Sequence, residues 1–344
     1  MEYYVGLDVS MKLTAVCIVD RDGKVVRETA LCTEPSSLAS FLGGTGLEFR
    51  RVGLEAGPMS SWLHDGLAAA GLVVVCVEAR HMQAALSAMR NKTDRNDARG
   101  IAQMMRTGWF RRVHVKSPEA RRLRLLLVNR RMLVDKRRDI DNAIRGTLKV
   151  FGLKVGEVGR LGFEERVVSL LAARRGLLEL VEPMLVVRRA LLEQYDVLHR
   201  KLVDAARKDA VCRHLMTVPG VGPVVAAVYR TGVDDPGRFA RSHTVGAHFG
   251  LTPRKYASGE VERTGRISKC GDAMVRTGLY EAANVLLTRV KGWCALKAWG
   301  LRLAKRAGMQ KAKVAVARKL AVILHRMWVD GSEFRWGKES KAMA

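Results

Sequence analysis

Three short β-rich runs at the start of the chain limit the possible folds more than any other feature. Residues 3–9, 13–19 and 25–32 are rich in Val, Leu, Tyr and Thr, and Asp-Arg-Asp-Gly at residues 20–23 predicts a tight turn. Consecutive strands joined by short connections pair antiparallel. The chain is therefore predicted to begin with a three-stranded meander.

Helical and strand patterns alternate after the meander. The expected elements are a helix over residues 35–42, a strand over 51–54 that ends at Glu55, a helix over 60–70, a strand over 73–77, and helices from about 81 and over 94–106. A meander followed by this alternation gives a mixed sheet with helices on both faces. Residues 1–110 are thus predicted to form an α/β domain of the ribonuclease-H type.

A long helical region is expected next. Ser117-Pro118-Glu119 combines an N-cap, a first-turn proline and a first-turn acid, and a Leu- and Arg-rich helix follows. A second helix is expected from roughly Glu164 to Cys212, and Pro183 is the point at which it could break.

Apolar residues of this second helix follow a spacing of three and four, with Arg188 as the interruption. They are Leu177, Val181, Met184, Leu191, Tyr195, Leu198, Leu202 and Ala205. The two helices together predict an antiparallel coiled-coil arm over residues 117–210, which packs on itself or on another subunit.

The last region, residues 211–335, is predicted to be a helical domain. It opens with Pro219-Gly220-Val221-Gly222 before an apolar helix, a pattern of the helix-hairpin-helix type. Backbone N–H groups at Gly220 and Gly222 could hold a phosphate, although such turns also join packed helices. Residues 254–269 are polar and basic, and residues 291–326 predict a basic helical tail.

The charge of the chain indicates its partner. Lys and Arg number 60 against 34 Asp and Glu, a net charge of +26, and the isoelectric point is about 10.4. Such a surface attracts nucleic acid strongly. An anionic membrane is not expected, because the longest apolar stretch is far below the ~20 residues of a spanning helix. With no signal segment and six scattered cysteines, we expect a cytoplasmic, nucleoid-associated protein with reduced thiols.

Four acidic residues stand out against this basic background. Asp8 and Glu55 end strands expected to be neighbours, and Asp94 and Asp97 are three apart at the start of a helix. Converging carboxylates repel one another unless a cation neutralises them, and Mg²⁺ suits an all-oxygen set. For Asp94 and Asp97 the alternative is a helix cap and a first-turn acid.

The same residues lie in motifs that resemble a known family. Gly6-Leu7-Asp8, Gly53-Leu54-Glu55 and the run from Asn91 to Arg99 are similar to the acidic tetrad of DEDD insertion-sequence transposases, the "IS one-ten" family related to Piv-type DNA invertases. The C-terminal half is similar as well, in the motifs Val218-Pro219-Gly220-Val221-Gly222, Gly250-Leu251-Thr252-Pro253-Arg254, Ser258-Gly259 and residues 266–272.

The resemblance implies a Mg²⁺-dependent DNA recombinase, with Mn²⁺ as a substitute, whose tetrad Asp8, Glu55, Asp94 and Asp97 binds the metal. It also implies that Ser258 is the nucleophile and forms a covalent phosphoserine with DNA. A structured noncoding guide RNA, the bridge RNA, is implied as a partner, together with a homodimer or homotetramer in which different subunits share a composite site.

Residues around this serine are expected to contact nucleic acid. Candidates for backbone contacts are Arg254, Lys255, Arg263, Arg266 and Lys269, although they could also form a solvated basic face. Ser268 and Ser242 compete with Ser258 when each serine is considered alone.

Two other functions remain possible from the sequence. The chain could be a RuvC-like, structure-specific nuclease that uses metal-activated water, with no role for Ser258. It could also be a basic nucleic-acid-binding protein whose acids are only caps and ion-pair partners.

Overall fold

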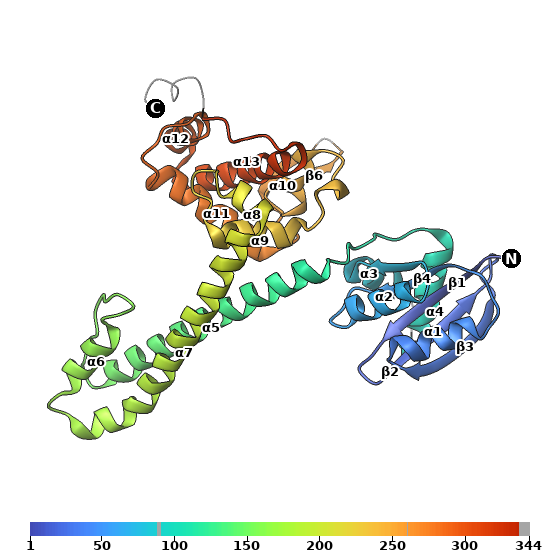
Figure 1. The fold of residues 1–344 in the computed structure, drawn as a ribbon, viewed down its shortest axis with the longest axis horizontal. Helices are drawn as coiled ribbons and strands as arrows, with labels where there is room; N and C mark the ends of the chain where they lie inside the picture. The colour runs from blue at the N-terminus through green and yellow to red at the C-terminus, as the bar shows by residue number, and fades with distance from the viewer. Residues whose placement is uncertain (88–90, 260, 337–344) are drawn as a thin grey trace. The chain divides into compact units, whose positions relative to one another are not determined.

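The chain folds into two compact units (Figure 1). The computed structural model describes residues 1–87, 91–259 and 261–336 of the 344. The N-terminal unit is Met1–Lys116 and the C-terminal unit is Ser117–Ala344. Lys and Arg number 15 against 12 Asp and Glu in the first unit, but 45 against 22 in the second. Nearly all of the positive charge therefore belongs to the C-terminal unit.

The N-terminal unit contains a five-stranded mixed sheet. Its strands are β1 (Tyr3–Val9), β2 (Leu13–Val19), β3 (Val25–Cys32), β4 (Phe49–Glu55) and β5 (Val74–Val77). The order is β3-β2-β1-β4-β5; β1, β2 and β3 pair antiparallel, whereas β4 pairs parallel to both β1 and β5. The predicted meander and mixed sheet are confirmed.

Helices cover both faces of this sheet, as predicted. They are α1 (Pro35–Gly43), α2 (Ser60–Ala69), α3 (Ala79–Leu86) and α4 (Asp94–Thr107). On one face, α1 and α2 bury Leu38 and Leu63 against Leu7 and Leu54 of the central strands. On the other, α3 and α4 pack their apolar side chains against alternate residues of the same strands. This arrangement agrees with the ribonuclease-H type.

Two glycines let α4 lie directly on the sheet. Gly6 and Gly53 are opposite each other in the β1–β4 pairing. A Cβ at Gly6 would lie 2.1 Å from the carbonyl oxygen of Ala98, and one at Gly53 would lie 2.6 Å from the sulfur of Met105. At Gly6 only glycine leaves room for the helix backbone, whereas a Cβ at Gly53 would displace the Met105 side chain. The glycines of both acidic motifs therefore set the height of α4 above the sheet.

The C-terminal unit is mostly helical. Its helices are α5 (Pro118–Val150), α6 (Phe163–Leu171), α7 (Arg175–Lys208), α8 (Ala210–Leu215), α9 (Pro223–Val233), η1 (Pro236–Arg238), η2 (Ser242–Thr244), α10 (Val245–His248), α11 (Ala273–Thr288), α12 (Ala295–Ala307) and α13 (Met309–Asp330). Helices α5 and α7 pack side by side, and α6 caps their far end (Figure 1).

The prediction of one helix from Glu164 to Cys212 is wrong. Three helices cover this segment, and Asp209 separates the last two by capping α8, since its carboxylate accepts a hydrogen bond from the Cys212 amide at 2.7 Å. Pro183 does not break α7. It is exposed, so the carbonyl that loses its partner can face water.

The interruption at Arg188 lies inside the packed interface. Its side chain is 1% exposed, donates to a carboxylate oxygen of Asp141 at 2.7 Å and to the carbonyl of Arg160 at 2.6 Å, and covers the Phe163 ring. Met184, which was expected in the apolar stripe, is exposed, and Leu185 is buried instead. The buried positions of this stretch of α7 are therefore Val181, Leu185 and Arg188.

The remaining helices of the C-terminal unit surround one apolar core. Helices α9, α11 and α13 contribute its largest part, and the hydroxyl of Tyr229 donates to the carbonyl of Ala321 at 2.6 Å. Among the helices of the described residues, none combines the length and the apolarity that a bilayer-spanning segment needs. The cysteines are free thiols, and four of the six are buried.

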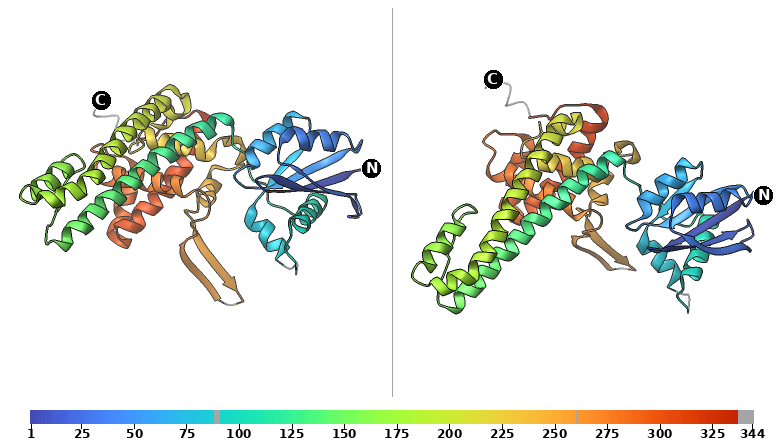
Figure 2. Two further views of the ribbon diagram at one scale, coloured as in Figure 1. Left: turned by 90° about the horizontal axis from the view of Figure 1, so that it is seen from below. Right: turned by 60° about the horizontal axis from the view of Figure 1, so that its bottom comes forward.

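A two-stranded hairpin projects from these helices (Figure 2). It consists of β6 (Pro253–Ser258) and β7 (Val261–Ile267), which pair antiparallel. The sequence indicated only a polar, basic segment here. Strand signals are weak because almost every residue of the hairpin is exposed, so no apolar face alternates with a polar one.

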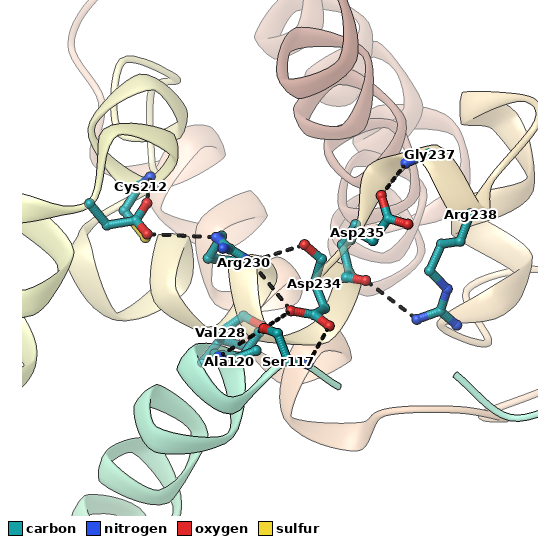
Figure 3. A network of polar contacts seen from close by, with 12 residues as sticks. Ser117, Ala120, Cys212, Val228, Arg230, Asp234, Asp235, Gly237 and Arg238 are labelled. Carbon is teal, nitrogen blue, oxygen red and sulfur yellow. Dashed lines mark hydrogen bonds and ion pairs between the residues drawn. The ribbon is translucent and has the colours of Figure 1, made fainter. Parts of the chain in front are cut away.

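A polar network fixes the start of α5 within the C-terminal unit (Figure 3). The carboxylate of Asp234 accepts hydrogen bonds from the Ser117 amide at 2.8 Å and the Ser117 hydroxyl at 2.6 Å. Asp234 is the centre of a γ-turn, with φ 64° and ψ −68°, closed by a bond from the Asp235 amide to the Val233 carbonyl. The strained turn thus holds the residue that caps α5.

Candidate functional site

Strand register directs Asp8 and Glu55 toward the same helix. Leu7 and Leu54 point into the core under α1 and α2. Because side chains alternate along a strand, Asp8 and Glu55 point to the opposite face, where α4 lies. The sheet therefore presents both carboxylates to α4.

The first turn of α4 supplies the other two acids. Ala98 and Ile101 of α4 contact the positions of Gly6 and Gly53. One turn earlier, Asp94 and Asp97 lie toward the ends of these strands, on the side of Asp8 and Glu55. Thr93, not Asp94, is the N-cap of α4, because its hydroxyl accepts from the Asn96 amide at 3.2 Å.

Electrostatics show that the four carboxylates form one cluster. The pKa of Asp8 is raised to about 6, first by burial and then by the negative charges of the other three acids. The pKa of Glu55 is also raised, by burial and by Asp97. Lys92 opposes both shifts. Charges shift each other's pKa in this way only at short range, so Lys92 lies near the acidic cluster as well.

Lys92 was not predicted as a site residue. It precedes Thr93 in the same motif as Asp94 and Asp97, and its position directly before a helix that carries two acids was the available signal. A cation beside four carboxylates reduces their mutual repulsion and could also contact a phosphate.

Arginines of the same motif anchor α4 to the edge of the sheet. Arg95 donates to Glu28 of β3 at 2.6 Å, and Arg99 forms two further bonds with the same carboxylate. These bonds, led by the one from Arg99, lower the pKa of Glu28 to about 2. The two arginines therefore help to hold the start of α4 in place.

The four carboxylates of the acidic cluster are suitable ligands for a cation, but they do not form a complete ligand shell. Among the residues that the structure describes, no group of three or more His, Cys, Asp or Glu side chains is arranged to hold a metal ion. The four carboxylates are gathered but not closed around a point. All of their donor atoms are oxygens, which hard divalent cations such as Mg²⁺ and Mn²⁺ prefer.

Ser258 belongs to the C-terminal unit, at the far end of the hairpin. It is the last residue of β6 and pairs with Val261 of β7. Cross-strand partners share a face, so Ser258 lies on the same face as the pair Tyr256 and Arg263. Lys255 lies on the opposite face, where its ammonium group pairs with Glu262 at 3.2 Å.

The cations that were predicted to contact nucleic acid do not all lie on the face of Ser258. Arg263 flanks the serine, Lys255 does not, and Arg266 and Lys269 lie at the base of the hairpin. Tyr256, which is exposed on the serine face, was not predicted. Its position two residues before Ser258 was the signal, but only the strand pairing shows that the two share a face.

Close backbone packing holds the base of the hairpin. Gly250 and Gly271 have positive φ, and a Cβ on either would clash with backbone atoms, of Cys270 and His248 respectively. Arg254 donates to the carbonyl of Ser268 at 3.1 Å, which joins the two strands. The motifs at residues 250–254 and 266–272, on either side of the hairpin, therefore fix the position of its base.

Asp272 ties this base to α5. Its carboxylate accepts from Arg124 at 2.8 Å and from the Met274 amide, which begins α11. Burial raises the pKa of Asp272, but the hydrogen bond and charge of Arg124 outweigh it, so the pKa lies below its usual value.

The competing serines have local partners. The hydroxyl of Ser268 accepts from the Cys270 amide at 3.4 Å. Ser242 lies 2.9 Å from Nδ1 of the buried His325, whose Nε2 contacts the Pro236 carbonyl at 3.0 Å. Since a carbonyl only accepts, Nε2 carries the proton and Nδ1 accepts from Ser242. Burial lowers the pKa of His325 and keeps the ring neutral.

Gly220 and Gly222 differ in their surroundings. Gly220 has φ +88°, and a Cβ there would lie 2.5 Å from the carbonyl of Ala282 in α11. Packing therefore accounts for this glycine. Gly222 is the N-cap of α9, and a Cβ there would meet open space.

Comparison with known proteins places both units in one class. A family model for DEDD transposases of the IS110 type matches residues 5–152, and the model for the "Transposase IS116/IS110/IS902 family" matches residues 212–299. The transposase for insertion sequence element IS1111A of Coxiella burnetii is 30% identical over 340 residues, which cover 96% of this chain and 91% of that protein.

Two further relatives point the same way. A protein of Pseudomonas aeruginosa named as a probable family 20 transposase is 29% identical over 244 residues, 68% of this chain and 71% of its own. The transposase for insertion sequence element IS1328 of Yersinia enterocolitica is 30% identical over 143 residues, 41% of this chain and 43% of its own. The fold and the acidic motifs are those of a DEDD transposase. The chain belongs to the IS110 family of insertion-sequence transposases.

Proposed function

We propose that this transposase cleaves and exchanges DNA strands with a metal-binding acidic cluster and a serine nucleophile. The observation that carries the proposal is the convergence of Asp8, Glu55, Asp94 and Asp97 over the glycines at which α4 meets the sheet. Four carboxylates repel one another when they are gathered, and a bound cation neutralises this repulsion.

Divalent metal fits these residues. The donor set is entirely carboxylate oxygen. The pKa of Asp8 is raised first by burial and then by repulsion from the other acids, and a cation would relieve this repulsion. Bound Mg²⁺ or Mn²⁺ would supply stabilisation of negative charge on the phosphate and the leaving oxygen. Lys92 would add positive charge at the same place.

Ser258 is the proposed nucleophile. Its oxygen attacks a DNA phosphorus, the P–O bond to the 3′ oxygen breaks, and the serine proton is lost to a base or to the leaving oxygen. The phosphoserine retains the energy of the broken bond, so attack by a different 3′-hydroxyl rejoins DNA without ATP. The exposed position of Ser258 on the hairpin suits a group that must reach DNA.

The C-terminal unit is the proposed binder of nucleic acid. Its excess of Lys and Arg, and the cations Arg254, Arg263, Arg266 and Lys269 on the hairpin, support contacts with phosphates. The turn between α8 and α9 would act as a helix-hairpin-helix element, with Gly222 as its open position. The resemblance of this chain to the family implies that its partners are donor and target DNA and a structured guide RNA.

We propose further that the arm formed by α5 and α7 is a coiled coil that assembles copies of the chain. Leu180 and Val187 of α7 are exposed and lie seven residues apart, about two helical turns, and Leu125 and Met132 of α5 are exposed in the same spacing. Apolar stripes of this kind fit helices of a second copy. Leu180→Glu with Val187→Glu should lower the oligomeric state in light scattering; an unchanged mass would contradict this role.

The nearest alternative is a nuclease that uses the acidic cluster and water. It would leave Ser258 without a role, although the cluster would be the same. The two functions differ in their product, since only recombination passes through a protein–DNA bond.

One experiment separates them. The full-length protein is incubated with Mg²⁺, its element ends and RNA from the flanking noncoding sequence, and the DNA is resolved on a denaturing gel. We expect DNA that migrates with protein, lost in Ser258→Ala and retained in Ser268→Ala. Nicked DNA that is unaffected by Ser258→Ala would favour the nuclease. Binding without any metal-dependent cleavage would refute both.

A further inference from the structure

A large hollow of the C-terminal unit lies at the base of the hairpin formed by β6 and β7, which carries Ser258 and is called the serine hairpin below. It is a groove of about 1190 Å³, and its walls are the base of β6 and β7, the exposed side of α13, and Trp299 of α12. This volume exceeds that of ordinary small-molecule pockets, which reach roughly 1,000 Å³. It is therefore large enough for part of a polymer.

The floor of the groove is apolar. Leu251 and Ile267 contribute from the base of the hairpin, Val314 and Val322 from α13, and the indole of Trp299 from α12. Hydration of such an apolar surface is unfavourable. A ligand with flat apolar faces would therefore be stabilised there, because its binding removes this surface from water.

All charged residues that line the groove are basic, and no acidic residue is among them. The five cations are Arg266, Lys269, Lys311, Arg318 and Lys319. Within the described part of the chain, no carboxylate forms an ion pair with any of these five. Lys319 instead lies over the Trp299 ring, 4.5 Å from its centre. The charge thus remains available for an anion.

We propose that this groove binds an unpaired DNA strand. Cations at the rim match its phosphates, and the apolar floor with Trp299 matches the faces of its bases. A duplex does not offer this combination, because its base faces are stacked inside and only its edges reach the grooves. The inference rests on the proposed function, since it assigns the strand to DNA from the neighbouring nucleophile.

The position of the groove relative to Ser258 supports this choice. Pro253 lines the groove and begins β6, and Ser258 ends it. Five residues of strand span about 17 Å at roughly 3.3 Å per residue. A strand that leaves the groove along the hairpin therefore reaches the serine within a few nucleotides. The groove would hold DNA that becomes unpaired next to the cleaved phosphate.

The first test is equilibrium binding of fluorescein-labelled oligothymidylate to the full-length protein, followed by anisotropy between about 50 and 200 mM salt. Lys311→Gln with Lys319→Gln removes two rim charges. The matched control, Arg302→Gln with Lys305→Gln, removes two exposed charges of α12 outside the groove. We expect about tenfold weaker binding in the groove variant alone, with a salt slope reduced by about 1.4. Equal losses in both variants would overturn the proposal.

The second test probes the floor. Val314→Thr with Val322→Thr keeps the shape of both side chains and adds hydroxyl groups, and Val329→Thr is the control on the exposed side of α13. We expect severalfold weaker binding of oligothymidylate in the floor variant and unchanged binding of a duplex of the same length. Unchanged oligothymidylate binding, or a change of oligomeric state in its place, would refute the groove as a DNA site.

Two further measurements distinguish the binding of DNA in the groove from the binding of RNA and from the cleavage reaction. Tighter, groove-dependent binding of oligouridylate than of oligothymidylate would assign the groove to RNA and overturn the choice of DNA. Ser258→Ala should bind oligothymidylate like the wild type. If no covalent adduct ever forms, the recombination mechanism fails while these binding data still decide the groove. Wild-type adduct yield in both groove variants would refute the groove alone.

Discussion

The acidic cluster and the serine hairpin are built in opposite ways. In the N-terminal unit, Asp8 and Glu55 extend from buried strands, and α4 lies so close that a Cβ at Gly6 would clash with its backbone. In the C-terminal unit, Ser258 ends a hairpin whose residues are almost all exposed. Four carboxylates must be held against their repulsion, which requires a rigid frame. A nucleophile that must reach DNA needs access more than packing.

The difference implies that the two regions respond differently to substitution. Changes beneath the acidic cluster should alter stability and chemistry together. Changes on the hairpin should alter chemistry with little effect on the fold.

Gly6→Ala should destabilise the N-terminal unit by roughly 3 kcal/mol or more, because the new Cβ meets the backbone of α4. Urea unfolding followed by circular dichroism measures this loss. Gly57→Ala is the control, since a Cβ there meets nothing within 4 Å, and it should change stability by less than about 0.5 kcal/mol. Similar values for the two variants would contradict the close approach of α4.

Glu28→Gln should cost about 1 to 2 kcal/mol at neutral pH, because it removes the partner of Arg95 and Arg99. The pKa of Glu28 in the folded chain is lowered to about 2, so its contribution is present above the ordinary carboxyl range and is lost as pH falls toward 2. The difference in stability between wild type and variant should shrink over that interval. A constant difference would refute the ionic origin.

Asp97→Asn should abolish metal-dependent cleavage and change stability by less than about 1 kcal/mol. The variant loses a favourable first-turn charge but also relieves repulsion with Glu55 and Asp8. Strand nicking on a gel and urea unfolding measure the two effects. Cleavage at the wild-type rate would remove Asp97 from the metal site.

Substitutions on the hairpin should leave stability within about 0.5 kcal/mol of the wild type. Tyr256→Ala and Arg263→Gln, on the face of Ser258, should lower the yield of the protein–DNA adduct by roughly tenfold, as expected for a lost stacking or phosphate contact. Lys255→Gln, on the opposite face, should leave the yield unchanged. Equal losses of adduct yield for substitutions on both faces would show that the yield does not depend on the face that carries Ser258.

Much of the N-terminal unit was predictable from local patterns. The strands at residues 3–9, 13–19 and 25–32 and the helix that starts at Asp94 were predicted with their correct bounds or starts. Each has a strong local signal, such as alternating apolar residues or the Thr93 cap. The position of Asp8 and Glu55 at one edge of the sheet was predicted from the ends of their strands, whereas the face that they share depends on the register of β1 and β4.

The C-terminal unit was less predictable because its signals depend on distant partners. Arg188 interrupts an apolar stripe in the sequence, yet it is buried because Asp141 and the Arg160 carbonyl, far along the chain, satisfy it. The hairpin has no buried face, so its strands carry no apolar alternation. The basic groove joins residues 251–323, which no sequence window brings together.

The sequence by itself determined the order of helices and strands, the four acidic positions and the basic charge, because periodicity, caps and composition are local properties. Only the tertiary structure decided which face of the hairpin Ser258 shares with Tyr256 and Arg263, why Gly6 and Gly53 are glycine, and where the cations enclose a groove. These features arise when segments far apart in the chain meet, and their geometry depends on packing rather than on any single segment.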